Sequence, residues 1–367
     1  MQRAFGLAIT LTLVAAFLFV LAERYVLHIQ SVTNYAWPAR VKTASIVFGG
    51  DMMFDRSIRT AIEKRTQKQG GLPAEALAQA GDFIFSCIDP VLADADLVVA
   101  NLEGPITEHA SISASSVPGD ASNFTFTFPT STSALLNSHN IRMVNLGNNH
   151  ILNFGRVGAK VTAQFLKDAD IGYFGQPTVI SSKALAQVGA AACPFEASCE
   201  GWAKGGGELM RTVSTKIIHG IPLAFINYNE FAPAEHSNIL ENVGMSSTTI
   251  FQIQNARASG YIPIVYTHWG VEYATTSSAY SRELAHRFIE AGAEIVIGSH
   301  PHVVQEHEVY NGKRIYYSLG NFIFDQYFSD DVTHGLLLKV AFNQSGVQLV
   351  KEIPIELERD RRTCLAL

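Results

Sequence analysis

The sequence has no surplus of basic residues and no run of like charges. Its 27 Lys and Arg residues are outnumbered by 33 Asp and Glu residues, which gives a formal net charge of −6 at pH 7. Because binding to nucleic acid normally needs a clustered basic surface, no nucleic-acid partner is predicted. The sequence also lacks a fixed-period repeat and a long low-complexity tract. Its 367 residues allow one large domain or two smaller ones.

Cysteine is scarce, with four residues in the chain. Cys193 and Cys199 lie close together in a polar, Gly-rich neighbourhood, which predicts a short disulfide loop in an oxidising compartment. Metal binding by this pair is the less favoured interpretation, because no second Cys/His pair with zinc-site spacing accompanies it. Cys87 and Cys364 have no evident partner in the sequence.

The N-terminus carries the one long apolar run. Arg3 precedes an uncharged stretch over residues 4–22, which is typical of a segment that meets the translocon. The stretch is close to the length of about 20 residues that spans a bilayer as a helix. We therefore expect residues 1–24 to be a single-pass membrane anchor, with the rest of the chain outside the cytoplasm. Val20-Leu21-Ala22 is a tolerable cleavage signal, so a cleaved signal peptide and a secreted or periplasmic protein is the alternative.

Beyond the N-terminus, short β-branched runs alternate with stretches of helical composition. The predicted buried strands are Ser45–Gly50, Leu97–Asn101, Met143–Leu146, Leu223–Tyr228, Ile262–Tyr266 and Ile295–Ile297. The predicted helices are Ala74–Ala80, Ser131–Leu136, Val157–Ala169, Ser247–Ser259 and Ser281–Ala291. Such alternation indicates an α/β sheet covered on both faces.

The same pattern divides the chain into regions. Residues 25–42 are expected to be a connector, 43–359 an α/β domain, and 360–367 a C-terminal tail. Residues 176–215 interrupt the alternation with Ser, Ala and Gly, which predicts a surface insertion. The last part of the domain is rich in strands, namely Arg314–Leu319, Leu336–Phe342 and Val347–Ile353. These strands favour a second, more antiparallel sheet, or a sheet edge, that closes the fold.

Polar residues of metal-ligand type stand repeatedly where the apolar runs end. The five segments are Gly49-Gly50-Asp51, Asn101-Leu102-Glu103-Gly104, Gly147-Asn148-Asn149-His150, Thr267-His268-Trp269-Gly270-Val271-Glu272 and Gly298-Ser299-His300-Pro301-His302. In an open α/β sheet, ligands bind at the carboxyl ends of the strands. Side chains far apart in the sequence are therefore expected to converge on one site.

Each of these segments alone has an ordinary structural interpretation. Asp51 after two glycines fits a turn or a helix N-cap, and a lone His268 is more often a hydrogen-bonded core histidine than a ligand. The pair His300 and His302 is harder to explain by packing. Carboxylate, carboxamide and imidazole together suit divalent Mn, Fe, Zn or Co, and the absence of nearby cysteine argues against a structural zinc site. One or two such ions are predicted.

The ordered motifs as a set resemble the CapA family, over about residues 44–328. They are Gly50-Asp51-Met52, Asn101-Leu102-Glu103, Asn148-Asn149-His150, His268-Trp269-Gly270-Val271-Glu272, Gly298-Ser299-His300-Pro301-His302 and Gly320-Asn321-Phe322. That family is associated with capsule and poly-γ-glutamate synthesis, and its domain is similar to the calcineurin-like metallophosphoesterases. The resemblance implies a layered metallophosphoesterase-like α/β sandwich that follows the N-terminal membrane helix.

The resemblance also implies roles for individual residues. Asp51 and His302 would bind a first metal, Glu103 would stand where phosphoesterases have their bridging carboxylate, and His150 would be a general acid with a pKa near neutrality. A second metal would be bound by Asn149, His268 and His300. Residues implied to line the pocket or to orient these ligands are Arg56, Asn101, Asn148, Glu272 and Asn321.

Two departures from the phosphoesterase pattern weaken an enzymatic interpretation. Phosphoesterases have Asp-x-His in the first motif, whereas Met53 stands at the His position here, as in CapA proteins. The family commonly has an Asp three residues after the His of Asn-Asn-His, and Asn153 occupies that position here. The first change predicts a first metal held by fewer ligands, and the second an altered orientation of His150.

Three functions follow from the sequence. The leading hypothesis is a metal-dependent hydrolase or transferase of capsule or poly-γ-glutamate assembly, acting on a polyanionic polymer or a phosphoester. The second is a membrane-anchored, non-catalytic accessory protein that organises or exports polymer together with other capsule-synthesis membrane proteins. The third is an extracytoplasmic phosphatase or nucleotidase. The alternating run of Phe124, Phe126 and Phe128 fits a groove wall, although one buried face of a strand is the favoured interpretation.

Overall fold

The computed structural model describes residues 23, 42–68, 79–175, 213–231 and 239–366. Within these residues no helix is both long enough and apolar enough to cross a bilayer. The expected anchor and connector lie outside the described residues apart from Glu23 and Lys42, as do the Cys193 and Cys199 pair and residues 74–78 of a predicted helix. The compact unit that carries the fold runs from Thr43 to Leu367.

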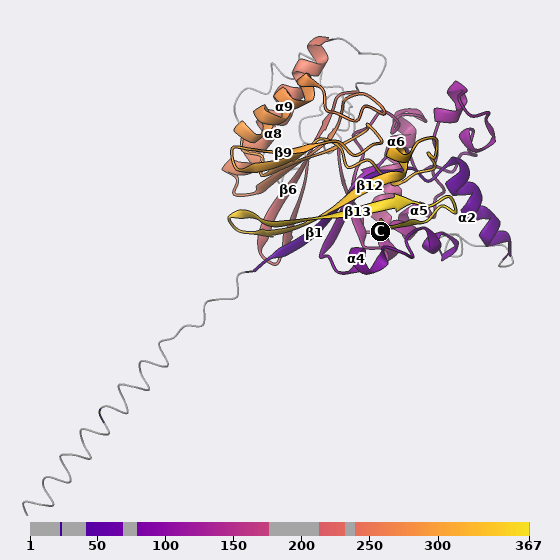
Figure 1. Cartoon of the computed structure of the whole chain (residues 1–367), viewed down its shortest axis with the longest axis horizontal. Coiled ribbons are helices and arrows are strands. Elements are labelled where there is room, and N and C mark those ends of the chain that lie inside the picture. The colour runs from indigo at the N-terminus through magenta and orange to yellow at the C-terminus, as the bar shows by residue number, and fades with distance from the viewer. Residues whose placement is uncertain (1–22, 24–41, 69–78, 176–212, 232–238, 367) are drawn as a thin grey trace, which may run out of the picture. The chain divides into compact units, whose positions relative to one another are not determined.

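Two mixed sheets organise this unit (Figure 1). The order of the first is β14 (Thr363–Leu365), β13 (Gly346–Leu357), β12 (His334–Asn343), β1 (Ala44–Met52), β2 (Leu97–Leu102), β3 (Ile141–Asn145) and β4 (Gly172–Phe174), with β11 (Asn321–Ile323) beside β1. The order of the second is β5 (Val213–Ile218), β6 (Ile221–Asn229), β7 (Ile262–His268), β8 (Ile295–Ser299), β10 (Lys313–Tyr316) and β9 (His307–Tyr310). In each sheet the central strands are parallel: β1 to β4 in the first, and β6, β7, β8 and β10 in the second.

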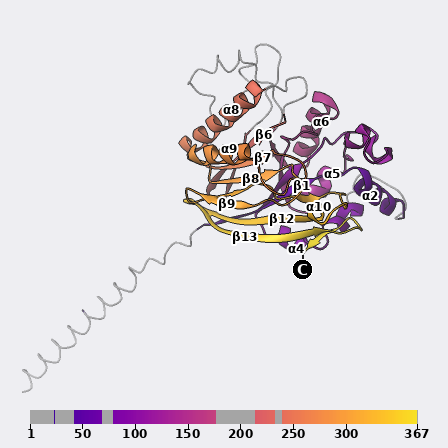
Figure 2. The same ribbon diagram turned by 45° about the horizontal axis from the view of Figure 1, so that its top comes forward.

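Helices cover the outer face of each sheet. Those on the first sheet include α2 (Arg56–Lys68), α4 (Asp89–Ala93), α5 (Thr132–Ser138) and α6 (Gly155–Asp168), and those on the second are α8 (Ile239–Ala258) and α9 (Ala279–Glu290). Short turns of helix are η1 (Asp82–Ile84), η2 (Ser113–Ser115), η3 (Ala121–Phe124) and α10 (Asp330–Thr333). Figure 2 shows α8 and α9 on the side of β6 to β9, and α4 beyond β12 and β13.

Three apolar clusters match this layering. Side chains alternate across a strand, so Val47 packs under the helices of the first sheet while Ile46 and Phe48 pack between the sheets. Ile264 of the second sheet meets them there, and Val265 turns to α8 and α9. The parallel strands are buried on both faces, which explains why they appear in the sequence as continuous apolar runs.

The strands predicted from the apolar runs form where expected, as do the predicted helices within the described residues. The alternation of strands and helices indicates one covered sheet, whereas the layered α/β sandwich that the resemblance implies agrees with the two sheets found. The parallel strands divide between two sheets that face each other. Of the C-terminal strands, β10 joins the second sheet parallel to β8, and β12 and β13 extend the first sheet from β1. A mixed α/β fold with two sheets is the result. Local patterns give each strand its type, whereas pairing depends on long-range contacts that no local pattern contains.

Two region boundaries also change. The expected C-terminal tail, 360–367, contains β14, which pairs antiparallel with β13 and therefore belongs to the first sheet. Residues 213–215, expected within the surface insertion, lie in β5 and pair with β6. The rest of the insertion, 176–212, lies outside the described residues.

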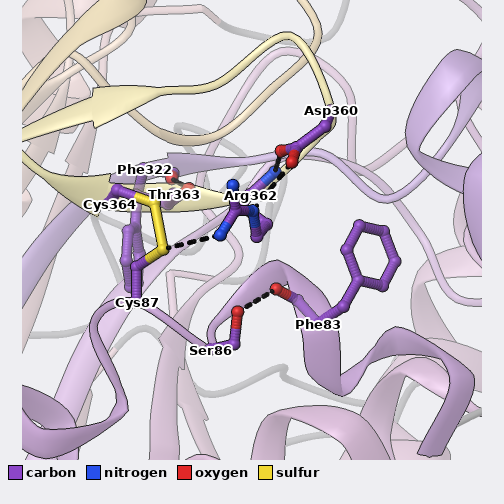
Figure 3. The surroundings of a disulfide bond; sticks show 8 residues. All are labelled: Phe83, Ser86, Cys87, Phe322, Asp360, Arg362, Thr363 and Cys364. Carbon is purple, nitrogen blue, oxygen red and sulfur yellow. Dashed lines mark hydrogen bonds and ion pairs between the residues drawn. A yellow bond between two sulfur atoms is a disulfide. The ribbon is translucent and has the colours of Figure 1, made fainter.

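A disulfide joins Cys87 and Cys364, which the sequence had left without evident partners (Figure 3). They are 277 residues apart in the chain, and Cys87 lies between η1 and α4 while Cys364 is in β14. Two neighbouring bonds hold the same segment: Thr363 Oγ1 donates to the Phe322 carbonyl at 2.7 Å, and the Ala366 N–H donates to the Pro354 carbonyl at 3.0 Å. The disulfide therefore ties the last strand to the helical layer.

Candidate metal centre

The structure brings the strand-end residues of both sheets to one place. Asp51 is near the end of β1, Glu103 directly follows β2, and His268 is the last residue of β7. Asn149 and His150 follow β3, and His300 and His302 follow β8. The carboxyl ends of parallel strands share an edge, so the two sheets present these side chains toward each other.

Glycines allow the strand ends to come this close. A Cβ on Gly50 would lie 1.9 Å from the carbonyl oxygen of Gly320, and a Cβ on Gly298 would lie 1.9 Å from that of Tyr317. Gly50 thus lets β1 approach the segment before β11, where the Asp51 N–H donates to the Gly320 carbonyl at 3.1 Å. His300 and His302 adopt positive φ values of 96° and 59°, an uncommon conformation that clusters at functional sites.

Two groups of possible ligands share Glu103. One contains Asp51, Glu103 and His302, and the other Glu103, His268 and His300; within each, one ligand atom per residue lies within 4.8 Å of the others. Oε1 of Glu103 is 3.6 Å from His302 Nε2 and 3.9 Å from His268 Nε2. Asn149 joins the second group, because its Oδ1 is 2.9 Å from His268 Nε2.

Hydrogen bonds fix the tautomers of the imidazoles. Asn321 donates its amide protons to three acceptors, so its Oδ1, 3.0 Å from His302 Nδ1, accepts a proton from that nitrogen. Ser299 Oγ donates to the Thr267 carbonyl and therefore accepts from His268 Nδ1 at 3.0 Å. In both rings the proton is on Nδ1, and Nε2 presents its lone pair toward Glu103.

Several buried hydrogen-bond acceptors of this site have no donor. Both carboxylate oxygens of Glu103 and Nδ1 of His300 are buried without a hydrogen-bond partner. Buried lone pairs are costly unless a donor or a cation satisfies them. The residues therefore fit a divalent metal, and metal-binding imidazoles are commonly held this way, with Nδ1–H bonded to a second layer of groups.

Burial dominates the electrostatics of these side chains. It raises the pKa of Asp51 to about 7, against hydrogen bonds from the His300 N–H and the Asn101 amide that favour the charged form. Burial and then the nearby Asp51 charge raise the pKa of Glu103 well above its ordinary value. Burial likewise lowers the pKa of His268 and of His302 well below the ordinary value. The imidazoles are neutral at pH 7, the form that binds metals.

Amides form a buried network behind the carboxylates. Asn101 Nδ2 donates to Asp51 Oδ1 at 2.7 Å, and Asn101 Oδ1 accepts from Asn145 at 3.0 Å and from Asn148 at 3.2 Å. Asn145 in turn accepts from Asn227 at 2.9 Å. The chain of amides, which includes Asn101 and Asn148, fixes the orientation of Asp51, while Asn321 holds the His302 ring. Asn145 and Asn227 were missed because isolated polar residues in strands carry no local signal.

His150 also approaches Glu103, with its Nε2 3.9 Å from Oε1. Asn153 Oδ1 accepts from the Phe126 N–H at 2.8 Å and from His150 Nδ1 at 3.1 Å, so Asn153 does orient this ring. The Phe126 ring lies 4.4 Å from it, centroid to centroid. Burial lowers the pKa of His150 to about 4. The expected pKa near neutrality is therefore corrected for the metal-free protein.

Changing Asn153 to Asp is expected to raise the pKa of His150 by about one unit or more, because a carboxylate beside the ring favours its charged form. Histidine-labelled NMR titration of the metal-free protein measures this shift directly. Asn311→Asp, in the exposed turn between β9 and β10, provides the matched control and leaves the His150 titration unchanged. An unchanged titration in Asn153→Asp contradicts the inferred contact between the two side chains.

The remaining predicted residues lie around this core. Arg56, the first residue of α2, forms an ion pair with Asp325, and its guanidinium lies 5.2 Å from the Phe126 ring centroid. Glu272 is exposed, yet its charge contributes to the raised pKa of Glu103. Met53, in place of a histidine, is fully buried in the apolar cluster of the first sheet and offers no imidazole.

The Phe run is not the predicted strand. Phe124 ends η3 and is 42% exposed, while Phe126 and Phe128 are buried. Another buried carboxylate, Asp55, was also missed by the sequence analysis. It accepts from Ser111 Oγ, Ser113 Oγ and the Thr127 N–H at 2.5, 2.7 and 2.8 Å, and so fixes the loop that carries these phenylalanines.

The chain is therefore a two-sheet α/β protein with a buried site that is compatible with a divalent metal. Carboxylate, amide and imidazole lone pairs converge on this site at the strand ends. Comparison with known proteins specifies the family. A model described as "Bacterial capsule synthesis protein PGA_cap" matches residues 45–326, and the chain belongs to this family.

Named relatives agree with this membership. The chain is 27% identical over 317 residues to the "PGA biosynthesis protein CapA" of Bacillus subtilis, covering 85% of this chain and 71% of the relative. It is 24% identical over 320 residues to the "Capsule biosynthesis protein CapA" of Bacillus anthracis, covering 84% of this chain and 66% of the relative. A "Probable polyglutamine synthesis accessory protein" of Mycobacterium tuberculosis is 34% identical over 74 residues, 20% of each chain.

Solved structures show more distant likeness. One described as a novel phosphatase of Mycoplasma pneumoniae has 11% identity and a TM-score of 0.48, over 86% of this chain and 94% of that one. A protein of Thermus thermophilus, TT1561, has 10% identity and a TM-score of 0.41, over 85% of this chain and 98% of that one. At these TM-scores the two likenesses carry no inference about this chain.

Proposed function

We propose that this protein acts in capsule or poly-γ-glutamate biosynthesis, with a metal-dependent hydrolase or transferase site of the metallophosphoesterase kind. Family membership and the names of the two Bacillus relatives support the pathway. The convergence of imidazole lone pairs on Glu103, whose two oxygens have no partner, supports the metal chemistry.

The donor set suggests how metal would be held. Asp51 and His302 are placed for one ion, Asn149, His268 and His300 for a second, and Glu103 for both. Mn, Fe, Zn and Co are the ions that such mixed oxygen and nitrogen donors prefer. When bound, these ions polarise a substrate oxygen and lower the pKa of a water molecule, which makes it a nucleophile at neutral pH.

The chain's own residues prepare the substrate. His150 keeps its Nδ1–H on Asn153, so its Nε2 is directed at the site and exchanges a proton there. A negatively charged substrate next to this ring raises its pKa from about 4 toward neutrality, because the charged imidazole gains a partner. Arg56 adds a fixed positive charge near Glu103. Phe231, with its ring 4.0 Å from that of His300, shields the second group from water.

Metal analysis and turnover test this proposal together. Full-length protein loaded with manganese is expected to hydrolyse p-nitrophenyl phosphate or a γ-glutamyl ester, and chelator stops the reaction. His300→Ala loses metal as well as turnover. His150→Ala keeps its metal but loses about 100-fold or more in turnover, as for the loss of a general acid or base.

The accessory role is the second candidate, favoured by the absence of an imidazole at Met53 and by the name of the mycobacterial relative. Stoichiometric metal binding without turnover of the phosphoester or the γ-glutamyl ester supports the accessory role. The proposed location is the same for both: a membrane-anchored domain outside the cytoplasm, next to other polymer-synthesis proteins. The Cys87–Cys364 disulfide supports an oxidising compartment. Protease digestion of intact cells, which removes an exposed domain, tests this location.

A further inference from the structure

A groove with a volume of about 1050 Å³ opens beside the metal centre. Its walls are α2, the segment around η2 and η3, the loop after β11, and the turn between β13 and β14. Arg56 and Tyr273 belong both to this groove and to the surroundings of the metal centre. The Tyr273 ring lies 6.0 Å from that of His302, and Arg56 acts on the charge of Glu103. The groove therefore leads to the candidate ligands.

Positive charge gathers on two walls of the groove. Lys64 and Arg65 come from α2, and Arg359 and Arg361 from the turn between β13 and β14. No ion pair joins any of these four to a carboxylate within the described part of the chain. The arginines rest instead on aromatic rings: Arg65 lies 3.4 Å from the centroid of Phe83, and Arg361 4.9 Å from that of Tyr327.

The acidic residues of the groove do not cancel this charge. Asp325 is paired with Arg56, and Asp360 is paired with Arg362 at 2.8 Å. Among the residues that the structure describes, four positive charges are thus left without a counter-charge, in a chain whose formal net charge is −6. Clefts lined by charge of one sign concentrate ligands of the opposite sign.

Exposed aromatic side chains accompany these charges. Tyr273 and Phe328 are 40% and 66% exposed, and their rings meet edge to face at 5.1 Å. Phe124 faces the same groove from η3. Apolar rings between basic walls match a chain that has methylene groups along its backbone and regularly spaced anionic groups. A small anion, in contrast, needs one compact set of donors.

The basic turn is held in place by bonds that need no ligand. The Glu358 N–H donates to the Arg362 carbonyl and the Arg361 N–H to the Glu358 carbonyl, both at 2.8 Å. The disulfide of Cys364 with Cys87 fixes the strand that follows, and Figure 3 shows Arg362 next to it. A rigid, preformed site loses less entropy on binding.

We propose that this groove binds an extended polyanion whose carboxylates recur along its length, and that the groove leads the polyanion to the metal centre. The binding depends only on the charges and rings of the groove. The delivery to the metal centre rests on the proposed function. An anionic membrane surface is the less favoured ligand, because the aromatic rings and the basic residues line a hollow and not a flat face.

Fluorescence anisotropy with fluorescein-labelled poly-γ-glutamate tests the binding on the full-length chain. At low salt the wild type binds, and the affinity falls as salt is added, because screening weakens the charge contacts. The double variants Lys64→Gln/Arg65→Gln and Arg359→Gln/Arg361→Gln each weaken binding by about tenfold. The matched control Lys167→Gln/Lys351→Gln removes two exposed charges outside the groove and changes the affinity less than about twofold.

The outcomes separate this proposal from the function proposed above. If only the metal centre has been misassigned, His300→Ala keeps its metal, and the polymer still binds to the groove. Equal losses in the groove variants and in the control overturn the groove, as does binding to vesicles of anionic lipid with no binding to the polymer. Metal content and circular dichroism at wild-type levels in the groove variants show that the fold is intact.

Discussion

Changing Glu103 to Gln is expected to make the metal-free protein more stable and the metal-loaded protein less stable than the wild type. In the metal-free protein, the Glu103 carboxylate is fully buried without a hydrogen bond, and its pKa is raised well above the ordinary value, first by burial and then by Asp51. Glutamine has nearly the same shape and no charge to bury. The substitution therefore removes a cost of folding, as long as no cation is present.

The pH dependence of this effect has a defined sign. A carboxyl group whose pKa is higher in the folded state than in the unfolded state stabilises the fold at low pH, and that stability is lost as the pH rises toward the folded value. The pH range of this effect begins at 4.5, the ordinary pKa of a glutamate side chain. Above it, the advantage of Glu103→Gln grows by at most about 1.4 kcal/mol for each pH unit. Urea denaturation in chelator, from pH 4 upward, measures this difference.

Metal is expected to reverse the order of stability of the wild type and Glu103→Gln. The wild type gains about 2.7 kcal/mol when free metal is one hundred times its dissociation constant. The variant gains much less stability from metal. Loss of a residue that only supports a ligand typically weakens metal binding by roughly 10- to 100-fold, and loss of a ligand itself is expected to weaken it by at least as much. If the order of stability is the same with and without metal, Glu103 is not a ligand.

Glu294→Gln is the matched control, a buried glutamate with the opposite environment. Burial alone would raise its pKa, but hydrogen bonds from Lys313, the Val347 N–H and Arg257 lower it below the ordinary value. A lowered pKa contributes stability above the unfolded value that is lost as the pH falls. Glu294→Gln therefore destabilises the protein at neutral pH, less so in acid, and without regard to metal.

The contrast between Glu103 and Glu294 shows what sequence can predict here. Glu103 follows a buried run at a strand end, and four other strand ends carry ligand-type residues, so local pattern and parallel-strand geometry together place the site. The strands themselves were also predictable, because residues buried on both faces form continuous apolar runs. Glu294 has no such local pattern, and its partners Arg257, Lys313 and Val347 come from three different elements.

The features that were not predicted depend on pairing across the fold. Nothing near β1 shows that it pairs with β12 and faces the second sheet across a shared core. The direction of the Asn153 amide, which sets the His150 tautomer, depends on the Phe126 N–H. The basic groove was hidden because a net charge sums over the whole chain, whereas Lys64 of α2 and Arg361 of the turn between β13 and β14 line one groove only in the folded protein.

Removing the Cys87–Cys364 disulfide is the second large effect expected. In Cys87→Ser/Cys364→Ser, the free energy of unfolding is expected to fall by roughly 2–5 kcal/mol, because the bond closes a very long loop in the unfolded chain. Urea denaturation of the oxidised proteins measures the loss as a lower midpoint. The control Cys193→Ser/Cys199→Ser separates this bond from any effect of the other cysteines. A midpoint unchanged from the wild type contradicts a stabilising bond.

The same variant tests whether the last strand supports the groove. Without the bond, β14 keeps only three ladder pairs with β13 and the bonds of Thr363 and Ala366, so the turn that carries Arg359 and Arg361 is less firmly held. Faster hydrogen exchange at β14 and weaker binding of poly-γ-glutamate are expected together, with metal content unchanged, because Asp51 and Glu103 belong to the interior strand ends. If exchange at β14 rises and polymer binding does not fall, the turn is not part of the binding surface.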